Sequence, residues 1–170
     1  MHRVGLGFDV HPFAPEGSNR PLVLGGVRFP EGRGLQGHSD ADVVIHALCD
    51  ALLGAIGAGD MGSHFPDTDP RYRGLSSLEF LASLASMLAS GGWRLVNADL
   101  SVVTEAPRLA PRVAEMKSCL ARPLGVPDDA VNVKATRPEG LGALGRGEGI
   151  ACQAIVLVAR AGNGGSGGRK

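Results

Sequence analysis

The sequence has few aromatic residues, no net charge and no long apolar run, and each shortage excludes a class of function. Phe, Trp and Tyr make up 4% of the 170 residues, which leaves few rings for stacking on nucleic-acid bases. Basic and acidic residues both number 17, so no broad electrostatic field draws the chain to nucleic acid or anionic lipid. No uncharged apolar run approaches the ~20 residues that a membrane-spanning helix needs. We therefore expect no nucleic-acid partner and no membrane segment.

The three cysteines form no recognisable metal or disulfide motif. Cys49, Cys119 and Cys152 are far apart, and none belongs to a CxxC pair. They read as small core residues of a protein in the reducing cytosol. The N-terminus leads directly into a strand pattern and has no signal-peptide pattern. The sequence therefore predicts a cytoplasmic protein, and 170 residues suit a single domain with a sizeable core.

Alternating strand and helix patterns predict an α/β fold. A hairpin-like region is expected from Arg3 to Phe29, with Gly25-Gly26 as its turn. The last predicted strand is apolar on both faces, which is typical of a central strand covered on each side. We expect an α+β two-layer sandwich, in which a mixed sheet packs on helices, from residues 1–160, and a disordered Gly/Ser-rich tail at 161–170. Helices are predicted at 39–56, 76–90 and 111–122, and strands at 93–104, 131–136 and 150–159.

Three residues near the front of the chain have the spacing of a divalent metal site. Asp9 and His11 are two apart on a predicted strand, so their side chains should project from the same face. His46 lies on the first predicted helix, whose start is indicated by the capping-box spacing of Ser39 and Asp42. Three such ligands are typical of a zinc site that keeps a fourth position open for water or substrate. The alternative on spacing alone is an ordinary strand pair and a packed helix histidine.

Two neighbouring features favour the metal site over that alternative. Asp42, His46 and Asp50 recur every four residues and share one helical face. The segment 59–70 is rich in Gly, Pro and Asp and is predicted to be a loop that carries acids. Further along, the glycine-rich segment 137–149 would let backbone amides approach an anion closely.

Five segments, taken in order, resemble the 2-C-methyl-D-erythritol 2,4-cyclodiphosphate synthase family. The resemblance covers the chain from Val4 to about Ala159, and five segments at family-like spacing are very specific. The segments are Gly7-Phe8-Asp9-Val10-His11, then His38-Ser39-Asp40 with 46–54, then Gly59-Asp60-Met61-Gly62 with 65–69, then 129–136 and finally Gly145-Arg146-Gly147-Glu148-Gly149-Ile150-Ala151.

The resemblance implies the fifth step of the non-mevalonate route to isoprenoid precursors. The substrate would be 4-diphosphocytidyl-2-C-methyl-D-erythritol 2-phosphate, whose own 2-phosphate attacks the β-phosphorus of its CDP group. The products of this phosphorus–oxygen lyase would be the cyclic diphosphate and CMP. Such chemistry needs substrate orientation and neutralisation of phosphate charge rather than a protein nucleophile. The resemblance also implies a ferredoxin-like or chorismate-mutase-like fold, assembled as a homotrimer with each active site between two subunits.

The resemblance further implies a role for each candidate residue. Asp9, His11 and His46 would hold one Zn²⁺ per subunit, and Glu139 would bind a second ion, Mg²⁺ or Mn²⁺, with the diphosphate. The catalytic residues would be Thr136, His38 and Asp50, the last as the carboxylate partner of a zinc histidine. The substrate-contacting residues would be Ser39, Asp60, Gly62, Phe65, Asp67, Asp69, Thr104, Ala106, Pro107, Arg108, Leu109, Ala135 and Arg137.

These contacts divide the substrate among separate parts of the chain. The segment 104–109 would form the cytosine pocket, 60–62 would hold the erythritol hydroxyls, and 38–39 would contact the 2-phosphate end. Phe8 and Arg146 would line a cavity on the trimer axis that can hold an isoprenoid diphosphate. Plainer roles remain open as well: turn caps for Asp67 and Asp69, an N-cap for Ser39, and a structural role for Arg146.

Two positions depart from the family pattern. The family usually runs Thr-Thr-Thr-Glu where this chain has Thr136-Arg137-Pro138-Glu139, so an arginine replaces a phosphate-facing threonine. An arginine there could pair with phosphate or with a neighbouring carboxylate. Gln153 stands where glutamate is common, which puts the carboxylate partner of Arg146 and the axial ligand in question. Two other functions remain as alternatives: a zinc-dependent phosphohydrolase, and a non-catalytic trimer that binds isoprenoid diphosphates.

Overall fold

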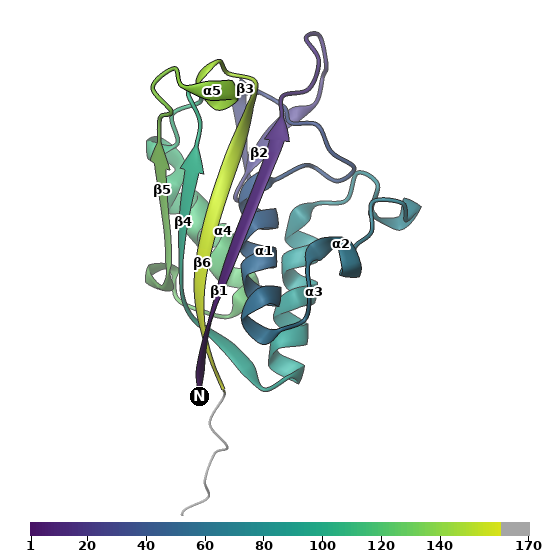
Figure 1. The fold of residues 1–170 in the computed structure, drawn as a ribbon, viewed down its shortest axis with the longest axis vertical. Coiled ribbons are helices and arrows are strands. Elements are labelled where there is room, and N and C mark those ends of the chain that lie inside the picture. The colour runs from purple at the N-terminus through teal and green to yellow at the C-terminus, as the bar shows by residue number, and fades with distance from the viewer. Residues whose placement is uncertain (161–170) are drawn as a thin grey trace, which may run out of the picture.

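The computed structural model describes residues 1–160, which form a four-stranded mixed sheet with helices on one face (Figure 1). The order of strands in the sheet is β1-β6-β4-β5. β6 runs antiparallel to both of its neighbours, and β4 runs parallel to β5. The strands are β1 (His2–Pro12), β4 (Trp93–Val103), β5 (Val131–Thr136) and β6 (Gly149–Arg160). The predicted sandwich with a mixed sheet is confirmed, and the predicted tail at 161–170 lies outside the described residues.

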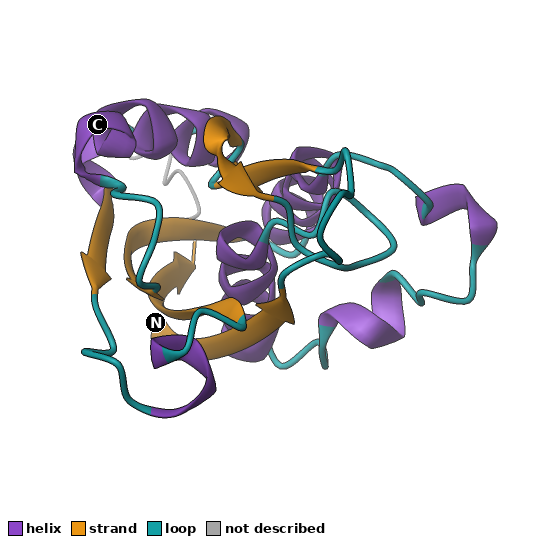
Figure 2. Ribbon diagram, turned by 90° about the horizontal axis from the view of Figure 1, so that it is seen from above, coloured by secondary structure: helices purple, strands orange, loops and turns teal. Residues whose placement is uncertain are grey.

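Three long helices cover the inner face of this sheet: α1 lies over β1 and β6, α4 lies over β5, and α3 contacts both of these helices (Figure 2). α1 is the central helix, and ten of its 14 residues are buried. The helices are α1 (Val43–Ile56), α3 (Ser77–Ser90) and α4 (Val113–Leu124), with short turns at α2 (Met61–His64) and α5 (Gly142–Gly145). Among the described residues no helix is long and apolar enough to cross a membrane.

Two glycines on β1 bring that strand against α1. A β-carbon on Gly5 would lie 1.9 Å from the carbonyl oxygen of Ala51, and one on Gly7 would lie 2.0 Å from that of Ala47. Both contacts are with helix backbone, which cannot move aside as a flexible side chain does. Asp9 and His11 follow on the same face of β1, so this close packing places them next to the N-terminal turn of α1.

Gly7→Ala should therefore destabilise the protein by about 3 kcal/mol or more, because the added methyl group overlaps helix backbone. Denaturant unfolding measures the change. Gly54→Ala is the matched control, since its β-carbon would meet only the carbonyl oxygen of Leu6, at 3.8 Å. Alanine in a helix should leave stability unchanged or raise it by up to ~1 kcal/mol. Equal effects of the two substitutions would contradict the packing argument.

The first helix begins at Val43 rather than at Ser39, so the predicted capping box is wrong. Ala41 has a φ of 57°, in the left-handed region, and breaks the helical path before it starts. Asp42 is the N-cap instead, and its buried carboxylate accepts from the backbone N–H groups of Val44 and Ile45. The same carboxylate also accepts from the backbone N–H groups of Gly25 and Gly26, at 2.8 and 2.7 Å. It therefore joins that turn to α1.

The predicted hairpin region divides into two parts. β2 (Pro21–Leu24) and β3 (Val27–Arg33) form a separate two-stranded sheet, and Gly25-Gly26 makes the turn as expected. β1 does not belong to this hairpin but pairs with β6, from His2 opposite Ala159 to Pro12 opposite Gly149. The sequence could not reveal this pairing, because the two strands lie at opposite ends of the chain.

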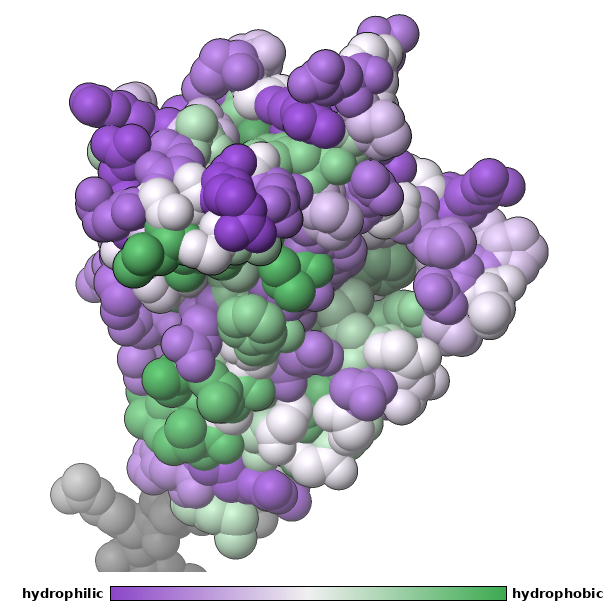
Figure 3. Space-filling model, turned by 45° about the horizontal axis from the view of Figure 1, so that its top comes forward, coloured by the Kyte–Doolittle hydropathy of each residue, from purple (hydrophilic) through white to green (hydrophobic). Residues whose placement is uncertain are grey.

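The outer face of the sheet is apolar and exposed. Val4, Leu6, Phe8 and Val10 of β1 are 50–66% exposed, and Ile155 of β6 is 49% exposed. Figure 3 shows hydrophobic surface gathered over these strands. β6 is central as predicted, but the expectation that both of its faces are covered is wrong for the single chain. Patches of this kind on a sheet face are typical of protein–protein contacts.

Two further predicted segments differ in detail. The acidic loop is mostly irregular, but Asp60 caps α2 and Asp69 caps a 3₁₀ turn at Pro70–Tyr72. The turn-cap interpretation is thus confirmed for Asp69. The third helix starts two residues later than predicted, because Pro111 lies in a preceding 3₁₀ turn, and it ends at Leu124 before a left-handed Gly125.

Candidate metal centre and substrate pocket

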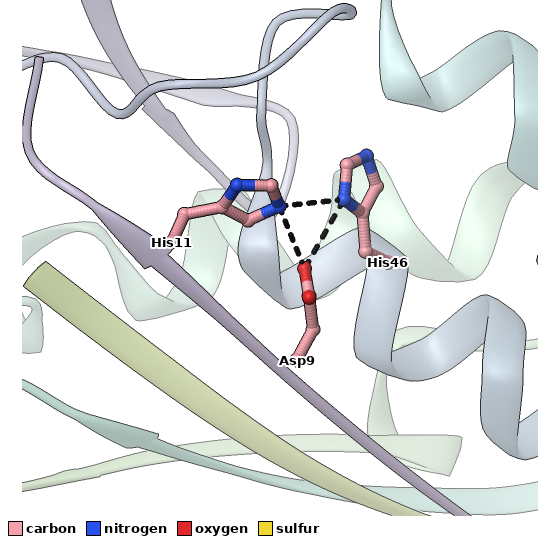
Figure 4. Close-up of side chains that lie close together, drawn as sticks. All are labelled: Asp9, His11 and His46. Atoms are coloured by element: carbon pink, nitrogen blue, oxygen red, sulfur yellow. Dashed lines mark hydrogen bonds and ion pairs between the residues drawn. The ribbon is translucent and has the colours of Figure 1, made fainter. Parts of the chain in front are cut away.

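Three side chains from β1 and α1 converge on one point, as the sequence predicts (Figure 4). Nε2 of His11 lies 2.9 Å from Oδ2 of Asp9, and Nδ1 of His46 lies 3.1 Å from the same oxygen. The two histidine nitrogens are 3.1 Å apart. Each residue therefore presents one donor atom to a common centre, although they come from segments more than 30 residues apart in the chain.

The outer nitrogens of the two histidines have partners that fix the orientation of the rings. Nδ1 of His11 donates to the carbonyl oxygen of Gln36 at 2.6 Å, which leaves Nε2 as the ligating atom. Nε2 of His46 lies 3.0 Å from the Ser77 hydroxyl and 3.2 Å from that of Ser39. Both imidazoles thus turn one nitrogen toward the centre and hold the other in a hydrogen bond.

Asp50 does not supply the expected contact to a histidine. Its Oδ1 accepts from the backbone N–H of Met61 at 2.8 Å and so ties α1 to the start of α2. Hydroxyls take the place that was predicted for this carboxylate, and Ser77 was missed entirely. No pattern in the sequence could have found Ser77, because it comes to His46 only through the packing of α3 on α1.

The donor set fits a tetrahedral zinc ion. Bonds of about 2.0–2.1 Å to zinc would place neighbouring donors about 3.3 Å apart. The three measured separations, 2.9–3.1 Å, are close to this value and need only a small expansion. One carboxylate oxygen with two imidazole nitrogens is a set that zinc accepts in catalytic sites.

The three residues also perturb one another's proton affinities. Burial alone would raise the pKa of Asp9, but hydrogen bonds and charge from His11 and His46 outweigh it and hold that pKa well below its usual range. For His11, burial lowers the pKa, while the hydrogen bond and charge of Asp9 raise it by more. The ionised Asp9 carboxylate is therefore stabilised, and the proton affinity of the His11 ring is increased.

The metal centre opens into a pocket of about 490 Å³. A recess between the body and the protruding segment 59–75 is visible in Figure 3. The apolar wall of the pocket consists of the rings of Phe65, Tyr72 and Phe80, whose centres are 4.8–5.7 Å apart. Sequence reasoning missed Tyr72 and Phe80. Eight predicted residues line this single pocket: Asp9, His11, His38, Ser39, His46, Gly62, Phe65 and Asp67.

Other predicted residues of the acidic loop point elsewhere. Asp60 accepts from the backbone and hydroxyl of Ser63, each at 2.8 Å. Asp69 pairs with Arg71 at 2.6 Å. Neither lines the metal pocket in the described chain.

The residues predicted for the nucleotide lie at the opposite edge of the sheet. They follow the carboxyl ends of β4 and β5, where the N–H of Thr104 donates to the carbonyl of Thr136 at 3.1 Å. Ala106, Pro107 and Arg108 line a separate hollow of about 410 Å³, beside Phe13 and Arg33. Leu109 is buried, while Ala135, Thr136, Arg137 and Glu139 are exposed. In the described chain none of these residues lines the metal pocket.

Glu105 joins the two parts of this nucleotide group. Its Oε2 accepts from Nε of Arg137 at 3.1 Å, and its Oε1 accepts from the N–H of Gly140 at 2.8 Å. Glu139 lies between them with a φ of 52°, a left-handed conformation that a non-glycine residue adopts only when its neighbours impose it. The carboxylate of Glu105 thus helps to fix the turn that presents Glu139.

The two residues predicted for the axial cavity come from β1 and from the turn that precedes β6. Phe8 is part of the exposed apolar face of β1. Nε of Arg146 lies 2.6 Å from Oε1 of Glu148, so this arginine has a carboxylate partner two residues away despite Gln153. This contact is not the pair expected on the trimer axis, whose usual carboxylate is replaced by Gln153.

Comparisons with known proteins agree with this geometry. The profile of the YgbB family matches residues 2–159. The 2-C-methyl-D-erythritol 2,4-cyclodiphosphate synthase of Geobacillus kaustophilus is 54% identical over 158 residues, which cover 93% of this chain and 98% of that protein.

Solved structures show the same fold. The bifunctional IspDF of Campylobacter jejuni superposes with a TM-score of 0.88 at 41% identity, covering 94% of this chain and 42% of that one. A CDP complex of IspF from Plasmodium falciparum gives a TM-score of 0.82 at 26% identity, covering 95% and 97%. The chain therefore belongs to the YgbB family, whose matched members include the 2-C-methyl-D-erythritol 2,4-cyclodiphosphate synthases.

Proposed function

We propose that this protein is a phosphorus–oxygen lyase that converts 4-diphosphocytidyl-2-C-methyl-D-erythritol 2-phosphate to 2-C-methyl-D-erythritol 2,4-cyclodiphosphate and CMP. The observation that carries the proposal is the convergence of Asp9, His11 and His46 at the wall of one pocket. Among residues 1–160, the pocket lining supplies histidines, hydroxyls and an apolar wall, and His46 faces the proposed metal rather than serving as a free base for Ser39. This inventory suits a reaction in which the substrate attacks its own phosphorus.

Asp9, His11 and His46 would hold zinc, which supplies a Lewis acid beside the reacting phosphate. His38 and Ser39 would contact the 2-phosphate, and the segment 60–62 the erythritol hydroxyls. Thr136 and the backbone at Ala135 would orient the diphosphate, while Glu139 would hold magnesium or manganese against it. The hollow beside 106–108 would take the cytosine. We place this pathway enzyme in the cytoplasm.

The affinity for zinc should rise with pH in the range just above pH 6. Zinc binds the neutral imidazole, whereas the raised pKa of His11 keeps a proton on it at that pH. Below this pKa, each pH unit should strengthen binding about tenfold, and above it the dependence should flatten. Competition with a chromogenic chelator at several pH values measures the effect. An affinity that does not change between pH 6 and pH 7 would rule out a protonated ligand in the metal-free centre.

We propose that the active site is shared between subunits of a homotrimer. The metal residues lie at the β1 edge of the sheet and the nucleotide residues at the β5 edge, both at the same end. Three strand spacings of ~4.8 Å separate the edges by about 14 Å. A closed ring would bring the nucleotide edge of one subunit to the metal edge of the next and cover the exposed apolar face. Phe8 and Arg146 would then surround the axis, where an isoprenoid diphosphate could bind.

Arg137 provides a test of the nucleotide half. Its side chain is 64% exposed, and among residues 1–160 it is bonded through Nε alone, to Glu105, so we expect its outer nitrogens to reach the diphosphate. Arg137→Thr should raise the Michaelis constant roughly tenfold, which corresponds to the loss of about 1.4 kcal/mol. Steady-state kinetics measure it. An unchanged or lower Michaelis constant would show that Arg137 serves only the turn.

The function itself is tested by the products. Wild-type protein loaded with zinc and magnesium is incubated with the substrate, and the mixture is analysed by phosphorus NMR and nucleotide chromatography. We expect one cyclic diphosphate and one CMP for each substrate consumed. A linear phosphate product in place of the cyclic one, with either CMP or CDP, or no turnover of a substrate that binds, would reject the proposal.

A further inference from the structure

Apart from the zinc proposed at its centre, the metal pocket offers little positive charge to a substrate with three phosphate groups. Among the residues that line it in the described chain there is no lysine or arginine, and its carboxylates are Asp9 and Asp67. A terminal phosphate monoester carries close to two negative charges at neutral pH. The zinc proposed at the centre serves the diphosphate, so cationic side chains for this second group would have to come from beside the pocket.

A second hollow, of about 600 Å³, adjoins the pocket through two shared residues, Gly37 and His38. The charged side chains that line it are two arginines, Arg20 and Arg73, and no carboxylate lines it among residues 1–160. The cations that the metal pocket lacks are thus gathered directly beside it, past His38.

Backbone contacts hold both arginines against the segment 38–39. The guanidinium of half-buried Arg20 donates to the carbonyl oxygen of Ser39. Gly74, next to Arg73, donates its N–H to the carbonyl oxygen of His38 at 2.7 Å. These contacts hold the two arginines next to His38 and Ser39, which line the metal pocket.

The side-chain donors of Arg73 are not engaged by the described residues, whereas its neighbour Arg71 is already paired with a carboxylate. Arg71 forms a bidentate pair with Asp69, in which Nη2 donates to Oδ2 at 2.6 Å and Nε donates to Oδ1 at 3.1 Å. Among residues 1–160 the side chain of Arg73 makes no hydrogen bond or ion pair, and it is exposed. An exposed guanidinium without a partner can bind two oxygens of a phosphate with its planar fork of N–H groups.

A third hollow, which His38 and Arg73 also line, is unsuited to an anion. It is lined by Asp67 and Asp69 as well as by Arg73. Two carboxylates there would repel a phosphate, whereas the side lined by Arg20 and Arg73 would attract it. The charges around His38 thus favour one direction for the end of the substrate.

We propose that Arg20 and Arg73 form an anion subsite that binds the terminal phosphate monoester of the substrate. The subsite rests on the proposed function, because it assumes that the nucleophile is a phosphate on the substrate. Its role is to neutralise that phosphate while the diphosphate is held at the metal centre. His38 stands between the two groups that must react.

The test compares the substrate with 4-diphosphocytidyl-2-C-methyl-D-erythritol, which lacks only the 2-phosphate. For Arg73→Ala, kcat/KM for the substrate should fall tenfold or more, because a charge-assisted contact is lost. The inhibition constant of the unphosphorylated compound should not change. Arg73→Lys and Arg20→Lys should retain part of the activity, since each keeps one positive charge. Arg122→Ala removes an exposed arginine from α4, which lines neither hollow, and should change neither constant.

The outcomes separate the two proposals. An active wild-type enzyme whose Arg73→Ala variant loses affinity for both compounds equally, or for neither, overturns the subsite and leaves the function standing. A wild-type protein that binds the phosphorylated compound more tightly than the other, but makes no cyclic product, overturns the function. In that case the loss of this preference in Arg73→Ala, measured by calorimetry, still supports the anion site.

Discussion

His46→Ala should leave a folded protein that no longer binds zinc tightly and forms cyclic product about a thousandfold more slowly or less. The substitution removes Nδ1, one of the three donor atoms at the centre. Only Asp9 and His11 of β1 then remain as ligands. Folding should persist, because the partners of the ring outside the centre are two serine hydroxyls rather than buried charges. Metal content and initial rate are measured on the same preparation.

His64→Ala is the control for the loss of a histidine. The ring of His64 contacts the carbonyl oxygen of Ala58 at 2.7 Å and does not line the metal pocket. This variant should keep one zinc per chain. A zinc-free His46→Ala protein with full activity would contradict the assignment of the metal centre.

Mixing two inactive variants should restore activity if the site is shared. His46→Ala lacks an intact metal half, and Glu139→Ala lacks an intact nucleotide half, so each alone should be almost inactive. In trimers assembled from equal amounts, each junction has roughly one chance in four of joining two intact halves. We therefore expect about a quarter of wild-type activity after co-refolding. Native mass spectrometry verifies that mixed trimers are present.

A second mixture supplies the control. His46→Ala and His11→Ala damage the same half, so their mixed trimers contain no intact junction and should remain inactive. If both halves of a site come from one subunit, every site in either mixture carries a lesion. Verified mixed trimers of His46→Ala and Glu139→Ala without recovered activity would reject the shared site.

The metal ligands could be predicted from the sequence because local geometry decides two of them. Asp9 and His11 are two apart on a strand, and strand geometry alone places their side chains on one face. That His46 joins these two residues was inferred from residue chemistry. Gly5 and Gly7 make the contact possible, because they let β1 pack against the backbone of α1. The type of most elements followed from the periodicity of apolar residues.

Contacts between distant segments could not be predicted in the same way. The partner of His46 is Ser77, 31 positions away, and the strand that pairs with β1 is β6 at the other end of the described chain. The helix start was misplaced because Ser39 and Asp42 have the spacing of a capping box. The left-handed Ala41 and the bonds of Asp42 to the hairpin turn are tertiary features that a local pattern does not contain.

The residues of β1 on the outer face of the sheet show a third limit of prediction from sequence. Val4, Leu6 and Phe8 are apolar in a pattern that normally indicates a buried face, yet they are exposed in the single chain. The buried face of β1 is instead the one with glycines. An apolar pattern identifies a surface that avoids water, but it does not say whether the cover comes from the same chain or from another.

The source of the attacking oxygen is the most direct test of the central claim, that the substrate's own phosphate is the nucleophile. The zinc- and magnesium-loaded enzyme is run to completion in water enriched in oxygen-18, and both products are weighed by mass spectrometry. We expect no label in either the cyclic diphosphate or CMP, because the reaction takes no oxygen from water. One atom of oxygen-18 incorporated per turnover would show that water attacks, and the protein would then be a metal-dependent phosphohydrolase.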